Sequence, residues 1–379
     1  MPSQPLDVVI DGSPLSGTGV GSGIGTYTRG VVTALALRSD VRVTVLTDSP
    51  EDLPLGVIAG VARRDASRFL RRPRVQLIEH SIRLPLDLRR IRTPGSVFHN
   101  PTFHAPAAVA RPWVQTLHDA IPLVFDAPDQ VRLRKRWQRF GPRYRSASAV
   151  IAVSRHSAEQ GIRLLELDPR RVHIAYHGVD PRMQPPGDTL DPAPDDPPYV
   201  LVVSEYSHRK GFAEAFSVID DLADLGYPHR LLVAGRIHRW IADDLARLRA
   251  RARHPERIEL LGLVPDLVPL YQRASVYLST SRYEGFGLPA LEAMACGTPV
   301  VAFSNTAVTE IVDSGGVLVA DGDVVGIISA VRSLMDSPAS RAEWSARGIE
   351  RARGFTWQAS ADAHMAAYRA AANGGGFDQ

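Results

Sequence analysis

The sequence predicts an α/β protein built from two doubly wound units, each with a parallel sheet. Short apolar runs rich in Val, Ile and Leu alternate with longer Ala-, Leu- and Arg-rich segments at helical spacing, and both halves of the chain show this alternation. Such runs are typical of parallel strands that helices cover on both faces. At 379 residues, the chain is long enough for two domains.

The expected strands of the first half are residues 7–10, 41–46, 113–117 and 149–153. Those of the second half are residues 199–203, 230–234, 258–261, 276–278 and 299–302. A proline-rich segment separates the halves, and proline lacks the amide donor that sheets and helices need. We therefore expect an N-terminal domain at 1–182, a linker at 183–198 and a C-terminal domain at 199–354, followed by a last segment at 355–379.

Composition limits the possible functions. A net charge of +3 does not by itself predict nucleic acid binding, and the single cysteine, Cys296, leaves no thiolate cluster for a metal. No run is long and apolar enough for a membrane helix, and the N-terminus lacks the pattern of a signal peptide. The sequence thus predicts a soluble cytoplasmic enzyme without a cofactor.

Arginine carries nearly all of the positive charge, since only Lys135 and Lys210 of the 44 basic residues are lysine. Two arginine-dense stretches lie at 63–92 and 132–145. They are either solvated helix faces or a basic surface that meets an anionic acceptor or anionic lipid headgroups, which would place the enzyme peripherally at the inner membrane surface.

A glycine-rich loop follows the first expected strand, and a helix is expected to begin near Thr26. Glycines and a helix start suit a phosphate or a sugar hydroxyl. The alternative is a dinucleotide site of an oxidoreductase, with Asp48 as the ribose-binding acid. Each placement of the G-x-G-x-x-G pattern fails at its third glycine, which weakens that alternative.

Two further strand ends carry polar residues that suit a sugar donor. His118 and Asp119 follow the strand at 113–117, where a histidine can hydrogen-bond a reacting sugar, although a lone histidine is often structural. Arg209 and Lys210 follow the strand at 199–203, where two adjacent cations suit a diphosphate. A solvated surface charge pair is the alternative for these cations.

The segment 284–292 combines two carboxylates with a glycine-punctuated turn. Pro289 fits the first position of a helix, with Glu292 in the first helical turn. Glu284 and Glu292 can then face one ligand from opposite ends, one at a sugar and the other at a ribose. The amides expected to face that ligand are those of Phe286, Gly287 and Leu288. An acid that favours the helix dipole would explain Glu292 alone.

Together these motifs resemble glycosyltransferase family 4, a group of retaining enzymes with the GT-B fold, in which two Rossmann-like domains face each other across a cleft. The resemblance covers nearly the whole chain. The matching positions are 23–27, 118–119, 177–180, 209–211, 262–265, 284–292, 299–301 and 310. The chain departs from the family pattern at Ser204, where glycine is usual, and at Gly211, where asparagine is frequent.

The resemblance implies a role for each matching position. Glu284 would bind hydroxyls of the donor sugar, Glu292 would hold the ribose, and Arg209 and Lys210 would neutralise the departing diphosphate without a metal ion. His118 would lie close to the donor sugar. The donor-binding positions are Gly23, Ile24, Asp119, Ser204, Leu263, Val264, Gly285, Phe286, Gly287, Leu288 and Glu292. The segment 355–371 resembles the last helix of the fold, which crosses back to the N-terminal domain.

The function implied is retaining transfer of a hexose from a nucleotide sugar to a glycan, glycolipid or small-molecule acceptor. The segments 10–15 and 23–27 resemble members that use GDP-mannose, while a UDP-sugar remains an alternative donor. A phosphorylase-like enzyme and a catalytically inactive nucleotide-sugar-binding protein are the other functional alternatives. Asp321 and Asp323 match a metal-binding D-x-D pattern, but a turn is expected there.

Overall fold

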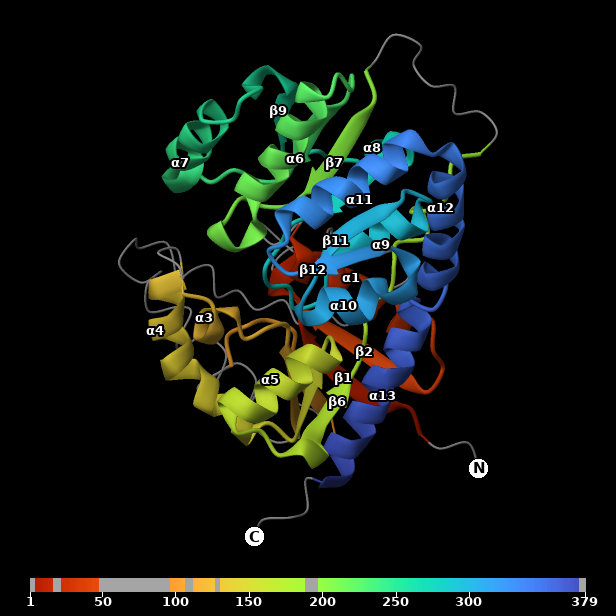
Figure 1. The fold of residues 1–379 in the computed structure, drawn as a ribbon. Helices are drawn as coiled ribbons and strands as arrows, with labels where there is room; N and C mark the ends of the chain where they lie inside the picture. The colour runs from red at the N-terminus through yellow and green to blue at the C-terminus, as the bar shows by residue number, and fades with distance from the viewer. Residues whose placement is uncertain are drawn as a thin grey trace. The chain divides into compact units, whose positions relative to one another are not determined.

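The structure is a computed structural model, and it describes residues 4–15, 22–47, 96–105, 112–126, 130–187 and 197–374. Contacts divide the chain into two compact units (Figure 1). The first unit comprises residues 1–123, 132–178 and 356–379, and the second comprises residues 124–131 and 179–355. The C-terminal helix therefore belongs to the same unit as the N-terminus.

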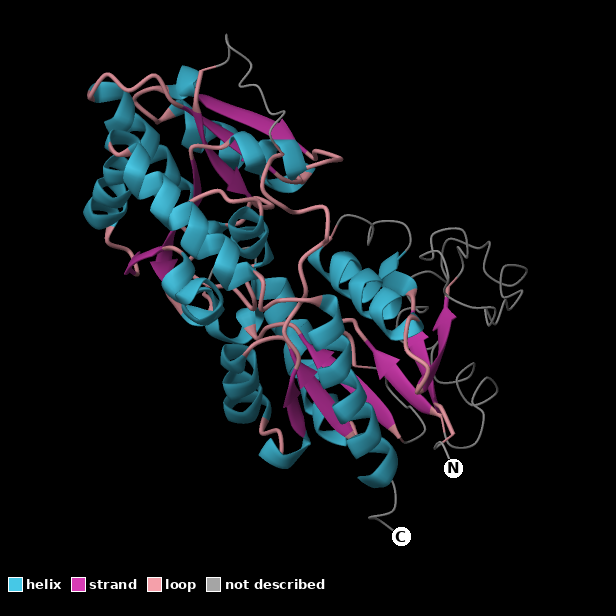
Figure 2. Ribbon diagram, turned by 90° about the vertical axis from the view of Figure 1, so that its right-hand side faces the viewer, coloured by secondary structure: helices cyan, strands magenta, loops and turns pink. Residues whose placement is uncertain are grey.

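The first unit is a parallel sheet with helices packed on it (Figure 2). Its described strands have the order β2-β1-β3-β4-β5-β6. Their bounds are β1 (Leu6–Asp11), β2 (Val41–Leu46), β3 (Val97–Asn100), β4 (Trp113–Leu117), β5 (Ala149–Ala152) and β6 (Val172–Ile174). The helices are α1 (Gly23–Ala36), α3 (Ile121–Val124), α4 (Val131–Phe140), α5 (Arg155–Leu165) and α13 (Trp357–Gly374), with 3-10 turns η1 (Ser13–Leu15), η6 (Gly141–Ser146) and η7 (Pro169–Arg171).

Helix α1 begins at Gly23, and the expected start near Thr26 is wrong by about one turn. The hydroxyl of Ser22 accepts a hydrogen bond from the amide of Gly25 at 3.1 Å, which satisfies one of the free donors at the helix start. Farther along, α1 packs closely on α13, because a Cβ atom at Gly30 would lie 2.2 Å from the ring of Trp357. Any larger residue at Gly30 would push the two helices apart.

Six buried polar groups from α1, β3, β4 and α13 form one hydrogen-bonded chain. In order they are the carbonyl of Ser360, His364, Tyr27, Thr116, His99 and Tyr368. Nδ1 of His364 donates to the Ser360 carbonyl at 2.7 Å, so a neutral His364 offers Nε2 to the Tyr27 hydroxyl at 2.7 Å. The Tyr27 hydroxyl then accepts from the hydroxyl of Thr116, which in turn accepts from Nε2 of His99. At the end of the chain, the Tyr368 hydroxyl donates to Nδ1 of His99 at 2.8 Å. These bonds join α13 to α1 and to the sheet of the first unit.

The second unit is also a parallel sheet, with the strand order β12-β11-β10-β7-β8-β9 that dinucleotide-binding folds use. Its strands are β7 (Tyr199–Val203), β8 (Arg230–Ala234), β9 (Ile258–Gly262), β10 (Val276–Ser279), β11 (Val300–Ser304) and β12 (Val317–Ala320). Its helices are α6 (Phe212–Asp224), α7 (Arg239–Ala250), α8 (Val268–Arg273), α9 (Leu288–Ala295), α10 (Thr306–Val312), α11 (Val324–Asp336) and α12 (Pro338–Ala352), with 3-10 turns η8 (His208–Lys210), η9 (Pro255–Arg257) and η10 (Asp313–Gly315).

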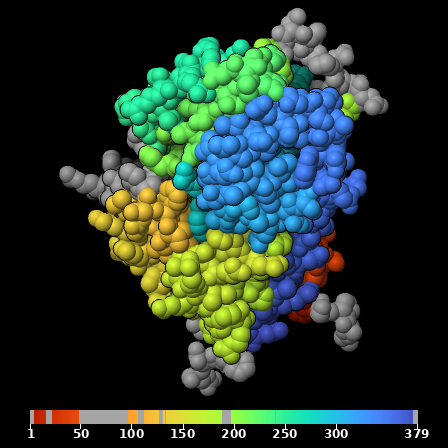
Figure 3. All heavy atoms as spheres, in the orientation of Figure 1, coloured from red at the N-terminus to blue at the C-terminus, as the bar shows by residue number. Residues whose placement is uncertain are grey.

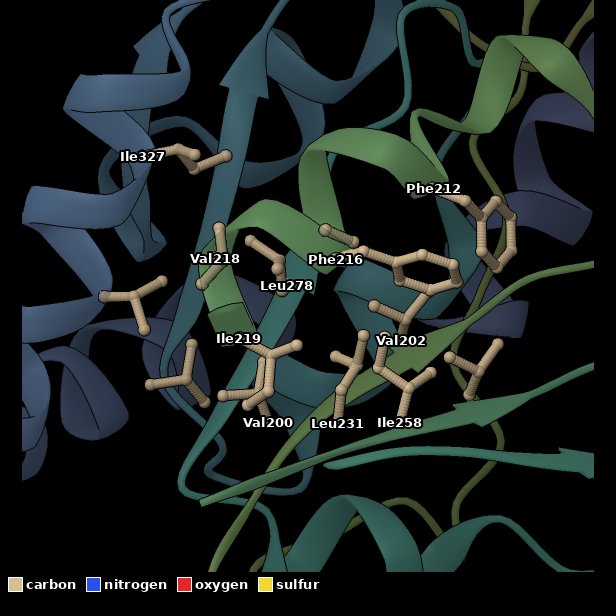
Figure 4. Packing of buried hydrophobic residues seen from close by; sticks show 14 of the residues in the cluster. Val200, Val202, Phe212, Phe216, Val218, Ile219, Leu231, Ile258, Leu278 and Ile327 are labelled. Carbon is tan, nitrogen blue, oxygen red and sulfur yellow. The ribbon is translucent and has the colours of Figure 1, made fainter. Parts of the chain in front are cut away.

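The core of the second unit lies between its sheet and the helices α6 and α11 (Figure 4). Phe212, Phe216 and Ile219 are spaced to line one face of α6, and all three are buried. They pack with strand residues such as Val200 and Leu231, which are fully buried. Because the central strands carry apolar side chains on both faces, their sequences read as the continuous apolar runs from which they were predicted.

All nine expected strands are present, and four of them have the predicted bounds, namely β2, β4, β7 and β8. Three of the described strands were not predicted. β3 ends in two polar residues, β6 has three residues, and β12 is only partly buried, so none of them forms a clear apolar run. The proline-rich segment lies largely outside the described residues, at 188–196, as do the arginine-dense stretch at 63–92, the glycine-rich loop at 16–21 and Asp48.

The buried histidines predict acid-sensitive stability of the first unit. Burial lowers the pKa of His364 to about 4, so this group binds a proton more tightly when the chain is unfolded. Stability is therefore lost as the pH falls from about 6.5 toward 4. In urea unfolding, wild type should lose about 2 kcal/mol more than His364→Gln between pH 7 and pH 5. Equal losses in both proteins would contradict a neutral buried His364.

Candidate active site

The predicted cations and the first predicted carboxylate meet where the order of strands in the second sheet reverses. β7 and β10 are neighbours there. The strand that follows β7 in the chain lies on one side of this pair, and the strand that follows β10 lies on the other. Arg209 and Lys210 lie in η8 after β7, and Glu284 lies in the loop after β10. Open parallel sheets bind ligands beyond the carboxyl ends of their strands at such a reversal.

Glu284 is bound by both cations. The Nζ atom of Lys210 lies 2.5 Å from Oε1 of Glu284, and a terminal nitrogen of Arg209 lies 3.3 Å from Oε2. The same nitrogen of Arg209 donates to the carbonyl of Tyr283 at 2.8 Å. The side chains of Lys210 and Glu284 are only 11% and 15% exposed, so water screens their attraction weakly. The three groups form one partly buried cluster.

The cluster keeps Glu284 ionised. Burial is the largest influence and by itself raises the pKa of Glu284, but the charges of Lys210 and Arg209, with hydrogen bonds from Lys210 and Ser281, outweigh it and lower that pKa to about 2. Burial and the neighbouring Arg209 lower the pKa of Lys210, against the opposing effect of Glu284. With both cations protonated, the cluster carries one net positive charge.

Gly211 is required by the backbone that presents the cations. Its φ of +65° lies in the left-handed region, and it both ends η8 and precedes α6. A Cβ atom at this position would lie 2.1 Å from the carbonyl oxygen of Thr280. The Thr280 hydroxyl in turn donates to the carbonyl of Gly211 at 2.7 Å. The departure from the family pattern at this position therefore has a local structural reason.

Glu292 lies in the second turn of α9, because the helix begins at Leu288 after Gly287 with a φ of +98°. The predictions that Glu292 lies in the first turn and that Pro289 opens the helix are thus both wrong by one position. Oε2 of Glu292 accepts a hydrogen bond from the hydroxyl of Tyr271 at 2.8 Å. Burial raises the pKa of Glu292 to about 7, although the bond from Tyr271 lowers it.

Tyr277 on β10 places the two carboxylates in one neighbourhood. Burial raises the pKa of its phenol, and the charges of Glu284 and Glu292 both raise it further. Its ring centroid lies 6.0 Å from that of Tyr271, which holds Glu292. Glu284 thus belongs to the cluster with the cations, while Glu292 is hydrogen-bonded to Tyr271.

The turn between the two acids is well ordered by packing. Phe286 is buried and contacts Phe355 edge-to-face, with ring centroids 6.2 Å apart. No side chain caps the start of α9 at Gly287. Leu288 is partly exposed, as is Gly285. The amides of this turn are at a helix start of the kind that binds anionic groups.

The other predicted donor positions of the second unit have different surroundings. Ser204 donates from its hydroxyl to the carbonyl of Glu205 at 3.0 Å, so its side chain turns toward its own loop. Leu263 and Val264 follow β9, and Leu263 is 59% exposed.

His118 in the first unit is neutral and hydrogen-bonded. Burial lowers its pKa to about 4, and its Nε2 donates to the carbonyl of Pro101 at 2.8 Å. Nδ1 is then the unprotonated nitrogen, which accepts hydrogen bonds. The ring of Tyr27 packs against His118 edge-to-face and also contacts His177, with both ring centroids 5.0 Å away. The Tyr27 network thus reaches His118.

The remaining predicted residues of the first unit lie at helix starts. Gly23 opens α1 and is exposed, and Ile24 follows it. One carboxylate oxygen of Asp119 accepts a hydrogen bond from the amide of Ile121 at 3.0 Å and so supports the start of α3. That contact gives Asp119 a structural role that the sequence did not indicate.

Several residues that build the site were not predicted. Tyr271 holds Glu292, and Thr280 closes the turn at Gly211. Thr306 accepts a hydrogen bond from the amide of Glu284 through its hydroxyl, at 3.0 Å. Each of them is an ordinary residue in the sequence, so only a contact between distant segments could reveal it.

The described ranges contain no cluster of metal-ligating side chains and no helix suited to cross a membrane. No group of three or more His, Cys, Asp and Glu residues in the described ranges is placed to hold a metal ion. Asp323 of the D-x-D match accepts a hydrogen bond from the amide of Gly326 at 2.8 Å and caps α11. Among the described helices, none combines the length and apolar character that a membrane span needs.

Two family models match the chain. The model described as "Glycosyltransferase Family 4" matches residues 21–182, and the model described as "Glycosyl transferases group 1" matches residues 191–351. The first match includes Gly23 and His118. The second includes the cluster of Arg209, Lys210 and Glu284.

Two curated relatives are similar over much of their length. O-antigen chain mannosyltransferase B of Escherichia coli is 30% identical over 295 residues, which cover 72% of this chain and 74% of that protein. D-inositol 3-phosphate glycosyltransferase 1 of Catenulispora acidiphila is 34% identical over 248 residues, which cover 61% of this chain and 59% of that protein.

Solved structures agree on the fold. Sucrose-phosphate synthase of Thermosynechococcus elongatus superposes with a TM-score of 0.73 at 22% identity, over 96% of this chain and 98% of the other. The Anabaena protein HepE, in complex with UDP and glucose, gives a TM-score of 0.68 at 18% identity, over 95% and 98%. These matches and the two parallel sheets show that the chain belongs to glycosyltransferase family 4 and is a glycosyltransferase with the GT-B fold.

Proposed function

We propose that this glycosyltransferase transfers a hexose from a nucleoside diphosphate sugar to a hydroxyl group, with retention at the anomeric carbon and without a metal ion. The observation that carries the proposal is the cluster of Arg209, Lys210 and Glu284 at the strand reversal of the second sheet. It combines a site for a diphosphate with a site for sugar hydroxyls.

The charge of the cluster favours a diphosphate ligand. Glu284 is ionised and faces two cations, so one positive charge is left over for the ligand. Arg209 offers a planar fork and Lys210 a compact charge, and both suit phosphate oxygens. Negative charge grows on the diphosphate as the sugar leaves, and fixed cations stabilise that charge in the transition state.

The carboxylates and His118 supply acceptors for hydroxyl groups. Ionised Glu284 would accept hydrogen bonds from the donor sugar, and Glu292 would accept them from the ribose. Neutral His118 donates through Nε2 to Pro101, so Nδ1 would accept a bond from a sugar hydroxyl. Leu263, exposed after β9, would cover the base.

Retention would follow from attack on the face that the diphosphate leaves. The bond from the anomeric carbon to the phosphate oxygen breaks, the acceptor oxygen bonds to that carbon on the same face, and the acceptor proton moves to the departing phosphate. Glu284 makes bonds to two cations, which supports its role as a binding group and not as a nucleophile. The amides of the turn at 286–288 would bind the diphosphate or the sugar.

For the donor, we propose mannose from GDP-mannose. The segments 10–15 and 23–27 support this choice, as does the similarity to an O-antigen mannosyltransferase. A UDP-sugar is the competing donor, because the structurally similar HepE binds UDP and glucose. The acceptor would be a glycan, a glycolipid or a small polyhydroxylated molecule, since the relatives include enzymes named for O-antigen and for inositol phosphate.

A panel of nucleotide sugars tests the proposal. In excess EDTA, GDP-mannose should raise the Tm of wild type and be slowly hydrolysed, because the cations of the protein replace a metal ion. Lys210→Ala should weaken binding of the same nucleotide sugar by about 1.5–3 kcal/mol in calorimetry, as expected for loss of a charged hydrogen bond.

Lys135→Ala is the matched control, since it removes the only other lysine in the chain and should leave the affinity unchanged. Unchanged affinity in Lys210→Ala would reject the role of the cation. Loss of turnover in EDTA that magnesium or manganese restores would reject metal independence.

The proposed role of Glu292 predicts pH-dependent donor binding. Its pKa of about 7 means that most of the carboxyl groups are protonated at pH 6 and ionised at pH 8. Only the carboxylate accepts bonds from both ribose hydroxyls, so donor affinity should fall about tenfold from pH 8 to pH 6. Calorimetry with GDP-mannose and UDP-glucose would measure it. A Glu292→Gln variant should show a flat profile, and the same pH dependence in both proteins would count against this role.

We also propose that α4 contacts an anionic membrane surface and so brings the enzyme to a lipid-linked acceptor. Lys135, Arg136 and Arg139 are exposed on this helix, and Leu133 is 40% exposed beside them, while Trp137 is buried. The part of the surface that includes α4 is amber in Figure 3. Basic residues near an anionic surface each contribute about 1 kcal/mol, and apolar neighbours add to the attraction.

Vesicle co-sedimentation tests this contact. Wild type should sediment with vesicles that contain anionic lipid but not with neutral ones, and Lys135→Glu/Arg139→Glu should abolish sedimentation. Arg347→Glu/Arg353→Glu, on α12 and at its C-cap, is the control, because it changes the net charge equally at exposed positions elsewhere. Equal loss in both double variants would show a general charge effect and would refute a membrane surface on α4.

A further inference from the structure

Three neighbouring strands of the second sheet end in residues that are hydrogen-bonded to one another. β10, β11 and β12 are adjacent and parallel, so their carboxyl ends lie at one edge of the sheet. Glu284 follows β10, Asn305 and Thr306 follow β11, and Asp321 follows β12. The first of these residues belongs to the proposed donor site, and the last belongs to the D-x-D match.

The hydrogen bonds along this edge have a defined direction. Nδ2 of Asn305 donates to Oδ1 of Asp321 at 2.6 Å and to the carbonyl of Ser281 at 2.9 Å. This leaves Oδ1 of Asn305 as an acceptor for the hydroxyl of Thr306, at 3.1 Å. The same hydroxyl then accepts from the amide of Glu284 at 3.0 Å. Each partner determines the orientation of the next.

Thr306 reaches Glu284 from an unfavourable backbone conformation. Its φ is +44°, which is an outlier for a β-branched residue. Such strain persists only where surrounding contacts hold the residue, and it is frequent at functional sites. Here Thr306 accepts from the amide of Glu284, and the amide of the next residue, Ala307, donates to the carbonyl of Glu284 at 3.4 Å. The main chain at Glu284 is therefore bound at its donor and at its acceptor.

We infer that Thr306 is a positioning residue for Glu284, and that Asn305 and Asp321 orient Thr306. The relay Asp321–Asn305–Thr306–Glu284 holds the backbone from which the carboxylate extends to Lys210 and Arg209, so that its oxygens meet the donor sugar. This inference rests on the proposed function of Glu284. It also gives the D-x-D match a purpose without a metal, because Asp321 anchors the relay and Asp323 caps α11.

The test compares ligands with and without the sugar. Calorimetry would give the affinity for GDP-mannose and for GDP, and likewise for UDP-glucose and UDP. Thr306→Val keeps the shape of the side chain but removes the hydroxyl, so it should weaken binding of the nucleotide sugar about tenfold, the factor typical of one hydrogen bond. Binding of the nucleotide diphosphate alone should change less than twofold.

Two matched variants make the result specific. Thr306→Ser retains the hydroxyl and should restore the affinity of wild type for the nucleotide sugar. Thr309→Val makes the same substitution on the same helix, where the hydroxyl contacts Ser304 and the residue is exposed, and it should bind as wild type does. If Thr306→Val does not fold, Thr306→Gly replaces it, because glycine adopts this φ without strain.

The outcomes separate the inference from the proposed function. Wild-type affinity in Thr306→Val, or equal weakening of both ligands, would overturn the role of Thr306. If GDP-mannose binds wild type no more tightly than GDP does, and Glu284→Gln leaves both affinities unchanged, the proposed role of Glu284 is rejected, whatever Thr306→Val shows.

The two aspartates provide a second measurement. Asp321→Ala should reduce the affinity for the nucleotide sugar about threefold, less than Thr306→Val, because Asp321 is exposed and its bond is screened. Asp323→Ala should lower the Tm through loss of the α11 cap but leave the affinity unchanged. Equal loss of affinity in both variants, restored by added manganese, would instead indicate a metal site and overturn the relay.

Discussion

The ion cluster of Lys210, Arg209 and Glu284 is the interaction on which the described site depends. The side chain of Glu284 is only 15% exposed, and a carboxylate with so little access to water remains charged only where cations and hydrogen-bond donors compensate its lost hydration. The two cations do this and leave the cluster with one net positive charge. The same contacts join the end of β7 to the end of β10, so the charge balance and the local fold stabilise each other.

Two backbone positions beside this cluster, Gly211 and Thr306, have positive φ angles. Gly211 turns the chain so that η8 ends against Thr280, and no side chain fits at that position. Thr306, which has a strained positive φ, accepts a hydrogen bond from the amide of Glu284. Both positions give up conformational freedom to place charged groups, which is a frequent arrangement in enzymes whose binding groups must be fixed before the ligand arrives.

The first unit uses neutral polar groups where the second uses charges. Its buried histidines have lowered pKa values, and the bonds between Tyr27, Thr116 and His99 connect α1 and the sheet with α13. Tyr27 also packs against His118, so the docking of the C-terminal helix and the environment of the proposed sugar-binding histidine share one residue. A neutral network of this kind specifies geometry without attracting counter-ions.

Sequence alone determined the parallel α/β architecture, most strand positions and the three charged residues of the cluster, because apolar runs and motif spacing are local properties. It missed β12 and the start of α1 at Gly23, since partial burial and a serine cap leave weak patterns. Only the tertiary structure showed that Glu284 binds both cations, that Glu292 is hydrogen-bonded to Tyr271 and that Thr306 accepts a hydrogen bond from the amide of Glu284. Those contacts join segments far apart in the chain, and their geometry depends on how neighbouring strands end at one edge of a sheet.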